Sequence, residues 1–328
     1  MSDEILTASL PEQGYVVSTW VHRFRSYGIV WVTAALFLLL TVTTDGFLTP
    51  TNLRNILDQQ AALLIAASVA TLTMIAGGFD VSLSAIAIAS GLTALRFENA
   101  TDSIIIGILA GLLAGLVFGA FNALVVSVLK VNSFIATLAT SFIIFGYGFV
   151  ISERSILRPA NHDFSAIART RVFGLTITTY VAIAVIAISW FVLSRTRFGR
   201  YVYAAGGNAE AARLAGVRVS WVVAATFALG GLAAGLAGTL SAARTMSAQP
   251  SDSFSFVFAV IAAIVVGGTS IAGGEGAVWR TVLGALFIAI MINGFNLHQI
   301  DPIFQRVVQG SVILGAVGID AWSQARRG

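Results

Sequence analysis

Long apolar runs separated by short polar stretches dominate this sequence. Runs of about 18 residues are long enough to cross a hydrocarbon layer of about 30 Å as α-helices. A transmembrane β-barrel would need alternating strands of about ten residues, and that alternation is absent. The pattern therefore predicts an all-α polytopic membrane protein with about ten transmembrane helices, at residues 28–44, 58–76, 81–96, 103–128, 133–151, 174–193, 219–243, 254–270, 277–297 and 303–321.

Composition supports this fold class. Hydrophobic residues make up 57% of the 328 residues, charged residues make up 10%, and the mean hydropathy is +0.88. No linker or low-complexity run interrupts the apolar segments, so we expect one transmembrane domain over residues 28–321. Residues 1–27 are polar and lack the short apolar core and cleavage site of a secretory signal. We expect them, and residues 322–328, to be tails.

The distribution of positive charge predicts the orientation. A pI of about 9.8 would suggest nucleic-acid binding in a soluble protein, but here the basic residues lie in loops, so we expect no nucleic-acid partner. The densest basic cluster lies around residues 195–219, which favours the cytoplasm for this loop. The arginines of residues 152–173, on the opposite predicted side, weigh against that assignment. On balance we expect both termini to be cytoplasmic.

Two distant segments resemble each other. In residues 119–146 and again in 293–318, a Gly and a Phe-Asn pair end one apolar run, a short polar link follows, and Phe opens the next run. The predicted topology places these links on opposite sides of the membrane, which is typical of an inverted repeat. Residues 58–151 would then correspond to residues 219–321. Chance similarity between apolar segments is the alternative.

Glycines recur at helical spacing in two of the apolar runs. Small residues on one helix face allow two backbones to approach closely in lipid. We expect these stripes to pack within the chain rather than against another subunit. They consist of Gly107, Gly111, Gly115 and Gly119 in one run, and Gly231, Gly235 and Gly238 in another.

Few residues near the apolar runs can carry chemistry. Asp80 is the one ionisable candidate; it precedes a predicted helix, so it can either cap that helix or line a translocation path. Neutral hydroxyls and amides suit an uncharged polyhydroxylated solute, although such groups also bond between helices. The candidate path residues are Asp80, Ser82, Ser84, Asn122, Asn132 and Thr137.

Catalysis is not indicated. The chain has no cysteine, no metal-ligand spacing and no nucleophile–base arrangement, so we expect neither an enzyme nor a metal site. The G-x-x-x-x-G-K-[ST] motif that cradles nucleotide phosphates is also absent. If transport is driven by ATP, a separate polypeptide must hydrolyse it, and this chain is expected to bind no cofactor.

One short polar element, "GGNAEAARLAG" at residues 206–216, interrupts the apolar pattern. Asn208 is a good N-cap, Glu210 and Arg213 suit the first and last turns of a helix, and Gly216 suits its end. Six or seven helical residues are too few to be stable alone in water. We therefore expect this helix to dock against something, with Leu214 as an apolar contact.

Three motifs carry a resemblance to a known family. "RTRFGRYVYAAGGNAEAARLAGVRV" at 195–219 resembles the cytoplasmic loop of the ribose/galactose-type sugar permeases of bacterial ABC importers. "GGFDVSLSAIA" at 77–87 and "VVGGTSIAGGEGAVWRTVLGAL" at 265–286 resemble further motifs of that family, in the same order. The resemblance covers nearly all of the chain from about residue 45. Ser84 departs from it, because the family usually has Gly there, and this bears on close packing and on substrate choice.

The resemblance implies the architecture of a type II ABC importer permease in the bacterial inner membrane. The partners would be a second permease subunit, cytoplasmic ABC ATPase subunits and an extracytoplasmic sugar-binding protein, and ATP would be used by the ATPase chain. Residues 195–219 would be the coupling loop, and its short helix would dock on the ATPase. The residues expected to act in coupling are Asn208, Glu210, Ala212, Arg213, Leu214 and Gly216.

The solute is expected to be a monosaccharide handed over by the binding protein. A branched-chain amino-acid or nucleoside permease is the alternative within related importers. An ion-coupled secondary carrier is the alternative from another class, but such carriers usually need several buried carboxylates or broken helices, and one Asp is weak support. A solvated amphipathic loop at residues 206–216 would explain its charges but not both helix caps.

Overall fold

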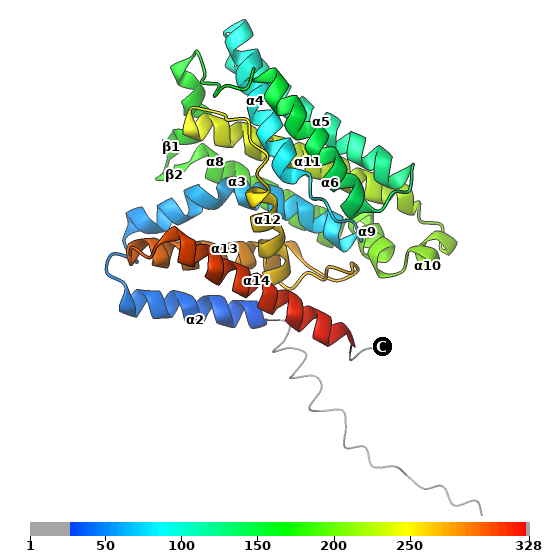
Figure 1. Ribbon diagram of the computed structural model, residues 1–328. Helices are drawn as coiled ribbons and strands as arrows, with labels where there is room; N and C mark the ends of the chain where they lie inside the picture. The colour runs from blue at the N-terminus through cyan, green and yellow to red at the C-terminus, as the bar shows by residue number, and fades with distance from the viewer. Residues whose placement is uncertain (1–26, 326–328) are drawn as a thin grey trace, which may run out of the picture.

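The computed structural model describes residues 27–325, which are almost entirely helical (Figure 1). The helices are α2 (Gly28–Thr43), α3 (Pro50–Ile75), α4 (Leu83–Thr101), α5 (Ile104–Ser127), α6 (Ser133–Ile151), α7 (Ala166–Arg169), α8 (Ile177–Arg195), α9 (Arg197–Gly207), α10 (Ala209–Leu214), α11 (Val219–Thr245), α12 (Ser255–Val266), α13 (Val278–Leu297) and α14 (Pro302–Ala325). A 3-10 turn, η1 (His162–Ser165), and two short strands, β1 (Arg171–Val172) and β2 (Leu175–Thr176), complete the described elements.

Each predicted apolar run coincides with a helix, which confirms an all-α polytopic membrane protein. Within residues 27–325, six helices are both long and apolar enough to span a membrane: α3, α5, α6, α8, α11 and α13. The apolar helices α2 and α12 are shorter. The count of ten crossings stays a prediction. Residues 322–325, expected in a tail, continue α14, whereas residues 1–26 and 326–328 lie outside the described part.

Two apolar runs give shorter helices than predicted, and glycine explains both. The run at 254–270 forms a helix only as far as Val266, because Gly267 caps it and Gly268 then adopts a φ of +82°. Residues 174–176 belong not to α8 but to the hairpin of β1 and β2. Phe173 and Gly174 make its two-residue turn with φ values of +47° and +87°.

The long helices α3 and α11 run antiparallel through the middle of the molecule. Near the end of α3 and the start of α11, the Thr73 hydroxyl donates to the carbonyl oxygen of Thr226 over 3.1 Å. At the opposite ends of the two helices, the Arg244 guanidinium donates to the carbonyl oxygen of Asp58 over 3.1 Å. Hydrogen bonds at both ends therefore fix the relative position of the pair.

The helices around this pair are arranged in corresponding ways. α11 packs against α4 and α5, and α3 packs against α12 and α13. α4 also packs against α6, as α12 does against α14. Figure 1 shows α4, α5 and α6 on one side of the molecule and α2, α13 and α14 on the other. If α3, α4, α5 and α6 correspond in order to α11, α12, α13 and α14, each of these contacts has its counterpart, as an inverted repeat requires. The repeat itself stays a prediction.

The predicted glycine stripes bring α5 and α11 into backbone contact. A Cβ added at Gly119 would lie 2.8 Å from the Cα of Gly231, and one added at Gly235 would lie 2.9 Å from the Cα of Gly115. Side chains at these positions would force the two helices apart. The stripes therefore pack within the chain, as expected.

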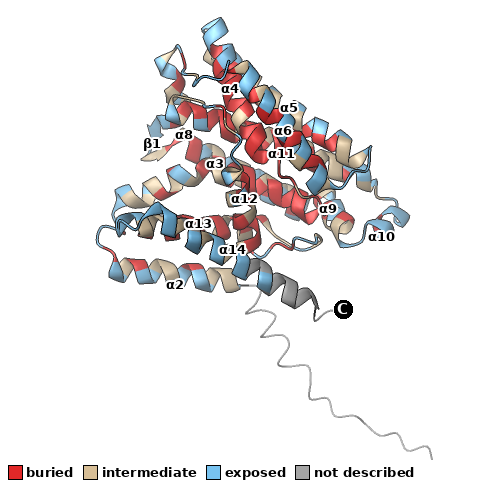
Figure 2. Cartoon of the chain, in the orientation of Figure 1, coloured by how far each residue is buried: buried red, intermediate tan, exposed pale blue. Residues whose placement is uncertain are grey.

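The core lies where α3, α4, α11 and α12 meet, and alanine, isoleucine and leucine dominate it (Figure 2). Large apolar side chains on the outer faces of α5, α6 and α8 are exposed, among them Leu113, Phe142 and Ile188. An exposed apolar surface of this extent would be unusual in water and suits contact with lipid.

Candidate functional site

The polar element at 206–216 forms the capped helix that the sequence predicts. The Asn208 side chain accepts a hydrogen bond from the backbone N–H of Ala211 over 2.9 Å, at the start of α10. Gly216 follows the helix with a φ of +84°, and the N–H of Val217 donates to the carbonyl oxygen of Ala212 over 3.0 Å. These bonds satisfy backbone groups at both ends of a helix of six residues.

One face of α10 is turned inward and the other is exposed. Ala212 is buried, whereas the Leu214 side chain is 83% exposed. Glu210 and Arg213 form an ion pair with an N–O distance of 3.0 Å, and both side chains are about two-thirds exposed. Because exposed pairs stabilise little, the ion pair shapes the surface more than it holds the helix together. α10 thus presents a protruding leucine beside a charged pair.

The preceding helix, α9, anchors α10 to the transmembrane helices, although the sequence predicts only a loop there. Val202 and Ala205 of α9 are buried in a cluster with Leu72 and Ile75 of α3. The same cluster includes one residue from each of α11 and α13, Val222 and Val278. α9 therefore touches helices of both proposed repeats.

The three motifs that carry the family resemblance meet beside α9. We call Gly77, Gly206, Gly207, Gly273 and Gly274 the glycine junction. A Cβ added at Gly273 would lie 3.0 Å from the Cα of Gly77, and one added at Gly274 would lie 2.7 Å from the Cα of Gly207. Gly77, Gly273 and Gly274 also have φ values between +74° and +88°. A side chain at Gly206, Gly273 or Gly274 would meet neighbouring backbone, whereas Gly207 contributes its own backbone to the contact.

A tyrosine hydrogen bond reinforces the glycine junction. The Tyr203 hydroxyl, on α9, donates to the carbonyl oxygen of Gly276 over 2.8 Å. Burial raises the pKa of Tyr203, and the nearby positive charge of Arg280 offsets this only in part. The phenol therefore remains a donor at neutral pH, and it ties α9 to the link between α12 and α13.

Several candidate path residues form a connected buried network. The Asp80 carboxylate accepts hydrogen bonds from the backbone N–H and the hydroxyl of Ser82, over 2.9 and 2.5 Å. The Asn122 amide donates to the Ser82 hydroxyl, and the Thr140 hydroxyl donates to the Asn122 carbonyl oxygen, both over 2.6 Å. The network joins the link between α3 and α4 to α5 and α6.

Asp80 does not cap α4 directly. The N-cap residue of α4 is Ser82, and Asp80 binds Ser82 rather than an N–H group of the helix, because it lies two residues before the N-cap position. Its second carboxylate oxygen is buried and has no hydrogen-bond partner among the described residues. Asp80 therefore stabilises the conformation of the residues that immediately precede α4.

The remaining path candidates lie at three separate places. The Thr137 hydroxyl accepts from the N–H of Val81 over 3.0 Å, and so extends the network. The Ser84 hydroxyl accepts from the N–H of Val257 over 2.8 Å, which joins α4 to α12. Asn132 is exposed and caps α6. In this conformation the candidates other than Asn132 are buried, and their role along a path stays a prediction.

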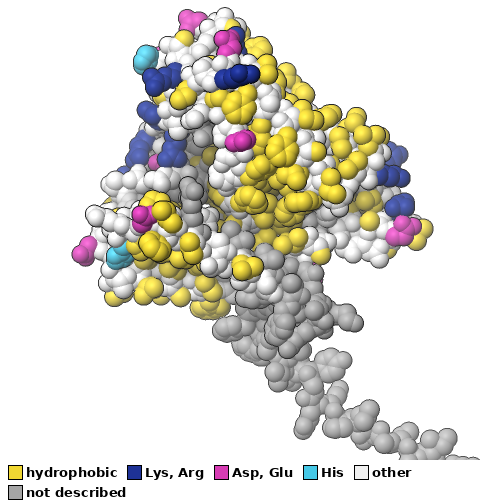
Figure 3. All heavy atoms as spheres, viewed as in Figure 1, with side chains coloured by type: hydrophobic (Ala, Val, Ile, Leu, Met, Phe, Trp, Pro, Cys, Tyr) yellow, Lys and Arg dark blue, Asp and Glu magenta, His cyan; other side chains and the backbone are white. Residues whose placement is uncertain are grey.

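The opposite end of the molecule carries a second set of charged residues. Asp58 of α3 is buried and accepts hydrogen bonds from the Thr176 and Thr179 hydroxyls over 2.9 and 2.6 Å. It also pairs with Arg171 at 3.2 Å. Arg154, Arg158 and Arg169 are exposed in the same region of residues 152–173. Figure 3 shows Lys and Arg side chains gathered at two opposite ends, beside α10 and beside β1, with hydrophobic side chains between them.

The described residues show no cluster of metal ligands, and other features stand out instead. Residues 27–325 contain no group of three or more His, Asp or Glu side chains placed to hold a metal ion. The features that stand out are the protruding helix, the glycine junction and the buried network, and all three suit the transmission of movement through a membrane protein.

Comparison with known proteins identifies the family. The family model described as "Branched-chain amino acid transport system / permease component" matches residues 52–317. The chain belongs to this permease family. No solved structure matches it.

Curated relatives of this permease match over nearly its full length. The chain is 36% identical over 301 residues to the L-arabinose transport system permease protein AraH of Escherichia coli (strain K12), which covers 91% of each chain. It is 33% identical over 323 residues to the ribose import permease protein RbsC of the same organism, covering 96% of this chain and 98% of the relative. It is 31% identical over 296 residues to the D-allose transport system permease protein AlsC, covering 90% and 91%. The predicted family is confirmed.

Proposed function

We propose that this permease is the membrane-spanning subunit of an ATP-driven ABC importer for a monosaccharide, in the bacterial inner membrane. The observation that carries the proposal is full-length similarity to permeases named for arabinose, ribose and allose. The importer would contain a second, identical or similar, permease subunit. The name of the family model refers to branched-chain amino acids, so an amino-acid solute is the alternative to be tested.

In this proposal α10 docks on a cytoplasmic ATPase subunit. Its ends are capped within the chain, so it is a stiff element, and Leu214 offers an apolar contact that nothing in the described residues covers. The arginines around α10 support a cytoplasmic position, and both termini then lie on that side. The chain itself would bind no nucleotide.

The glycine junction would carry the movement of α10 into the membrane. α9 leads directly into α10, packs against α3 and α11, and shares a buried cluster with the end of α3 and the start of α13. A displacement of α10 driven by the ATPase would therefore move the link between α3 and α4 and the link between α12 and α13 together. The first of these links holds Asp80 and the buried network, which we propose positions the walls of the translocation path.

The opposite end would meet an extracytoplasmic sugar-binding protein. The exposed arginines of residues 152–173 lie there, and they would attract a partner with acidic surfaces. The same arginines weaken the positive-inside argument, and a docking role gives them a reason to lie outside.

Uptake by purified, reconstituted components tests this function. The permease is placed in proteoliposomes with its ATPase subunit inside and its binding protein outside, and uptake of labelled arabinose, ribose, allose and leucine is measured. We expect ATP-dependent uptake of one of the sugars, unaffected by ionophores. Uptake that ignores ATP and stops when an ion gradient is dissipated would identify a secondary carrier. Uptake of leucine without any sugar would overturn the assignment of the solute.

A further inference from the structure

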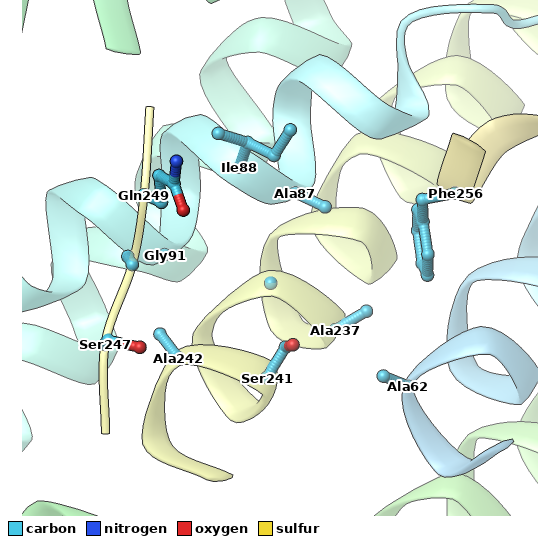
Figure 4. Close-up of a pocket in the computed structure, with 12 residues that line it drawn as sticks. Ala62, Ala87, Ile88, Gly91, Ala237, Ser241, Ala242, Ser247, Gln249 and Phe256 are labelled. Carbon is cyan, nitrogen blue, oxygen red and sulfur yellow. The ribbon is translucent and has the colours of Figure 1, made fainter. Parts of the chain in front are cut away.

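A small cavity lies between α3, α4, α11 and the extended segment that links α11 to α12. Its volume is about 180 Å³. This is room for about six water molecules at ~30 Å³ each, and it is below the ~300–1,000 Å³ of sites for drug-sized ligands. Figure 4 shows Ser247 and Gln249 at one side of the cavity and Phe256, at the start of α12, across from them. We call it the Gln249 cavity.

The polar groups of the Gln249 cavity are uncharged and available. Ser241, Ser247 and Gln249 line it, and no lining side chain is ionisable. The Ser241 hydroxyl and the Gln249 amide make no hydrogen bond to any residue of the described range, and the Ser247 hydroxyl reaches only the carbonyl oxygen of Thr245, over 3.5 Å. Hydroxyl and amide groups both donate and accept, so they match the alcohol groups of a sugar.

The rest of the wall is apolar and made largely of small residues. Ala62, Gly91 and Ala237 keep the space open, and Phe256 offers a flat ring. The C–H groups on one face of a pyranose or furanose ring pack well on an aromatic face, while its hydroxyls point sideways. One aromatic wall facing an amide and a hydroxyl therefore suits a single sugar ring, and no lining side chain offers an opposite charge to a carboxylate or an ammonium group.

The position of the cavity connects it to the arginine-bearing end of the molecule. Ala248 lines the cavity, and its N–H and carbonyl groups each pair with the backbone of Leu157 over 2.9 Å. Leu157 lies in the segment that also carries Arg154 and Arg158. A partner that displaces the arginine-bearing segment would therefore also displace Ala248 in the wall of the cavity, through the two backbone hydrogen bonds.

We propose that the Gln249 cavity binds the transported solute, an uncharged monosaccharide ring, where it leaves the binding protein. This inference rests on the proposed function, since it takes the solute class from it. Gln249 and Ser247 hold the hydroxyls of the sugar, Phe256 packs against its apolar face, and the Leu157–Ala248 pairing couples docking of the binding protein to the shape of the site.

The absence of cysteine makes a protection experiment possible in the complete importer. Gln249→Cys and Ser247→Cys each introduce one thiol into the cavity, and Thr51→Cys introduces one at an exposed position near the start of α3, outside the lining and outside residues 152–173. The rate of alkylation by a membrane-impermeant maleimide is measured in proteoliposomes with and without arabinose, ribose and allose. At a sugar concentration ten times its dissociation constant, we expect about tenfold slower alkylation at 249 and 247 and no change at 51.

Transport by a second variant checks the same site without thiol chemistry. Gln249→Leu keeps the size of the side chain but removes its hydrogen bonds, so we expect KM for the sugar to rise by about two- to tenfold with an unchanged unfolding temperature. Thr51→Ala, at an exposed position outside the lining, serves as the control. If wild-type permease takes up sugar while the thiols are never protected and Gln249→Leu keeps the wild-type KM, the cavity is not the site. If no preparation takes up any sugar, the proposed function fails, and this inference fails with it.

Discussion

The carbonyl oxygen of Ile75 lies where a side chain on Gly206 would have to begin. A Cβ added at Gly206 would overlap this oxygen, and the N–H of Gly274 donates to the same oxygen over 2.8 Å. The Ile75 carbonyl oxygen at the end of α3 therefore packs against α9 and also accepts a hydrogen bond from the link before α13. A movement of α9 should therefore displace both the end of α3 and the link before α13, because these backbones are closely packed.

Gly206→Ala is expected to stop transport by forcing these backbones apart. The added methyl group meets backbone atoms rather than a flexible side chain, and overpacking of this kind costs about 1–3 kcal/mol. We expect a lower unfolding temperature in detergent and a loss of ATP-dependent uptake. Gly207→Ala is the matched control, because a Cβ there meets nothing within 4 Å. Equal losses in the two variants would show that the close contact at Gly206 is not the cause.

The sequence predicts the helices of this protein better than it predicts how its motifs meet. Apolar runs longer than the membrane is thick identify the spans directly, and the Asn208 and Gly216 caps identify α10 because each acts within a few residues. The glycine junction could not be predicted in this way. Gly77, Gly206 and Gly274 are far apart in the chain, and only the packing of α3, α9 and α13 shows that they share one contact.

The polar candidates show the same limit. Asp80, Ser82 and Asn122 stand out in the sequence as polar residues in apolar surroundings. The sequence does not show that the Ser82 hydroxyl links the Asp80 carboxylate to the Asn122 amide. Ser84 stands where the resembled family usually has glycine, and its hydroxyl accepts a hydrogen bond from the N–H of Val257, which glycine cannot do. The partner is in α12, so no local pattern reveals it.

Tyr203→Phe tests the hydrogen bond between α9 and the link before α13. The variant keeps the ring and loses only the hydroxyl that donates to Gly276, so it leaves one carbonyl oxygen without this donor. The loss of one such bond costs about 0.5–1.5 kcal/mol. We expect normal ATPase binding, because the docking helix is unchanged. We expect fewer sugar molecules transported per ATP hydrolysed, because the hydrogen bond between α9 and the link before α13 is lost. Tyr201→Phe, on an exposed tyrosine of the same helix, is the control. An unchanged ratio of sugar to ATP in Tyr203→Phe would remove this bond from the coupling route.

Two substitutions of Asp80 separate a positioning role from direct contact with the solute. Asparagine keeps an oxygen that can accept from the N–H and hydroxyl of Ser82, whereas alanine keeps none. If Asp80 positions the start of α4, Asp80→Asn retains stability and uptake, and Asp80→Ala is destabilised by about 1–3 kcal/mol through unsatisfied donors. We expect this result in thermal unfolding and uptake measurements. A large change in KM for the sugar in Asp80→Asn at unchanged stability would instead place the carboxylate on the path.

Ala212→Pro tests whether α10 must be helical. Proline removes the bond from the Ala212 N–H to the Asn208 carbonyl oxygen, 2.9 Å in length, and its ring clashes with the preceding turn. The cost in a helix interior is about 3 kcal/mol, but it falls on a short helix outside the membrane helices. We expect normal insertion and a normal amount of protein in the membrane, with loss of ATPase binding. Ala209→Pro places proline at the first helical position, where it is tolerated, and serves as the control.

Leu214 is expected to be the main anchor of α10 on the ATPase. Its side chain is 83% exposed, so Leu214→Asp removes no internal contact and should leave the unfolding temperature unchanged. Burying a leucine at an interface contributes about 1.5–3 kcal/mol, so the substitution should weaken ATPase binding by about ten- to a hundredfold. The Glu210–Arg213 pair is exposed and worth only a few tenths of a kcal/mol, so replacing both residues by alanine should change binding by about twofold or less. Co-purification of the ATPase subunit from detergent compares the three proteins. Wild-type recovery and uptake with Leu214→Asp would show that α10 is not the docking helix, whereas a loss confined to the double alanine variant would place the anchor in the charged pair.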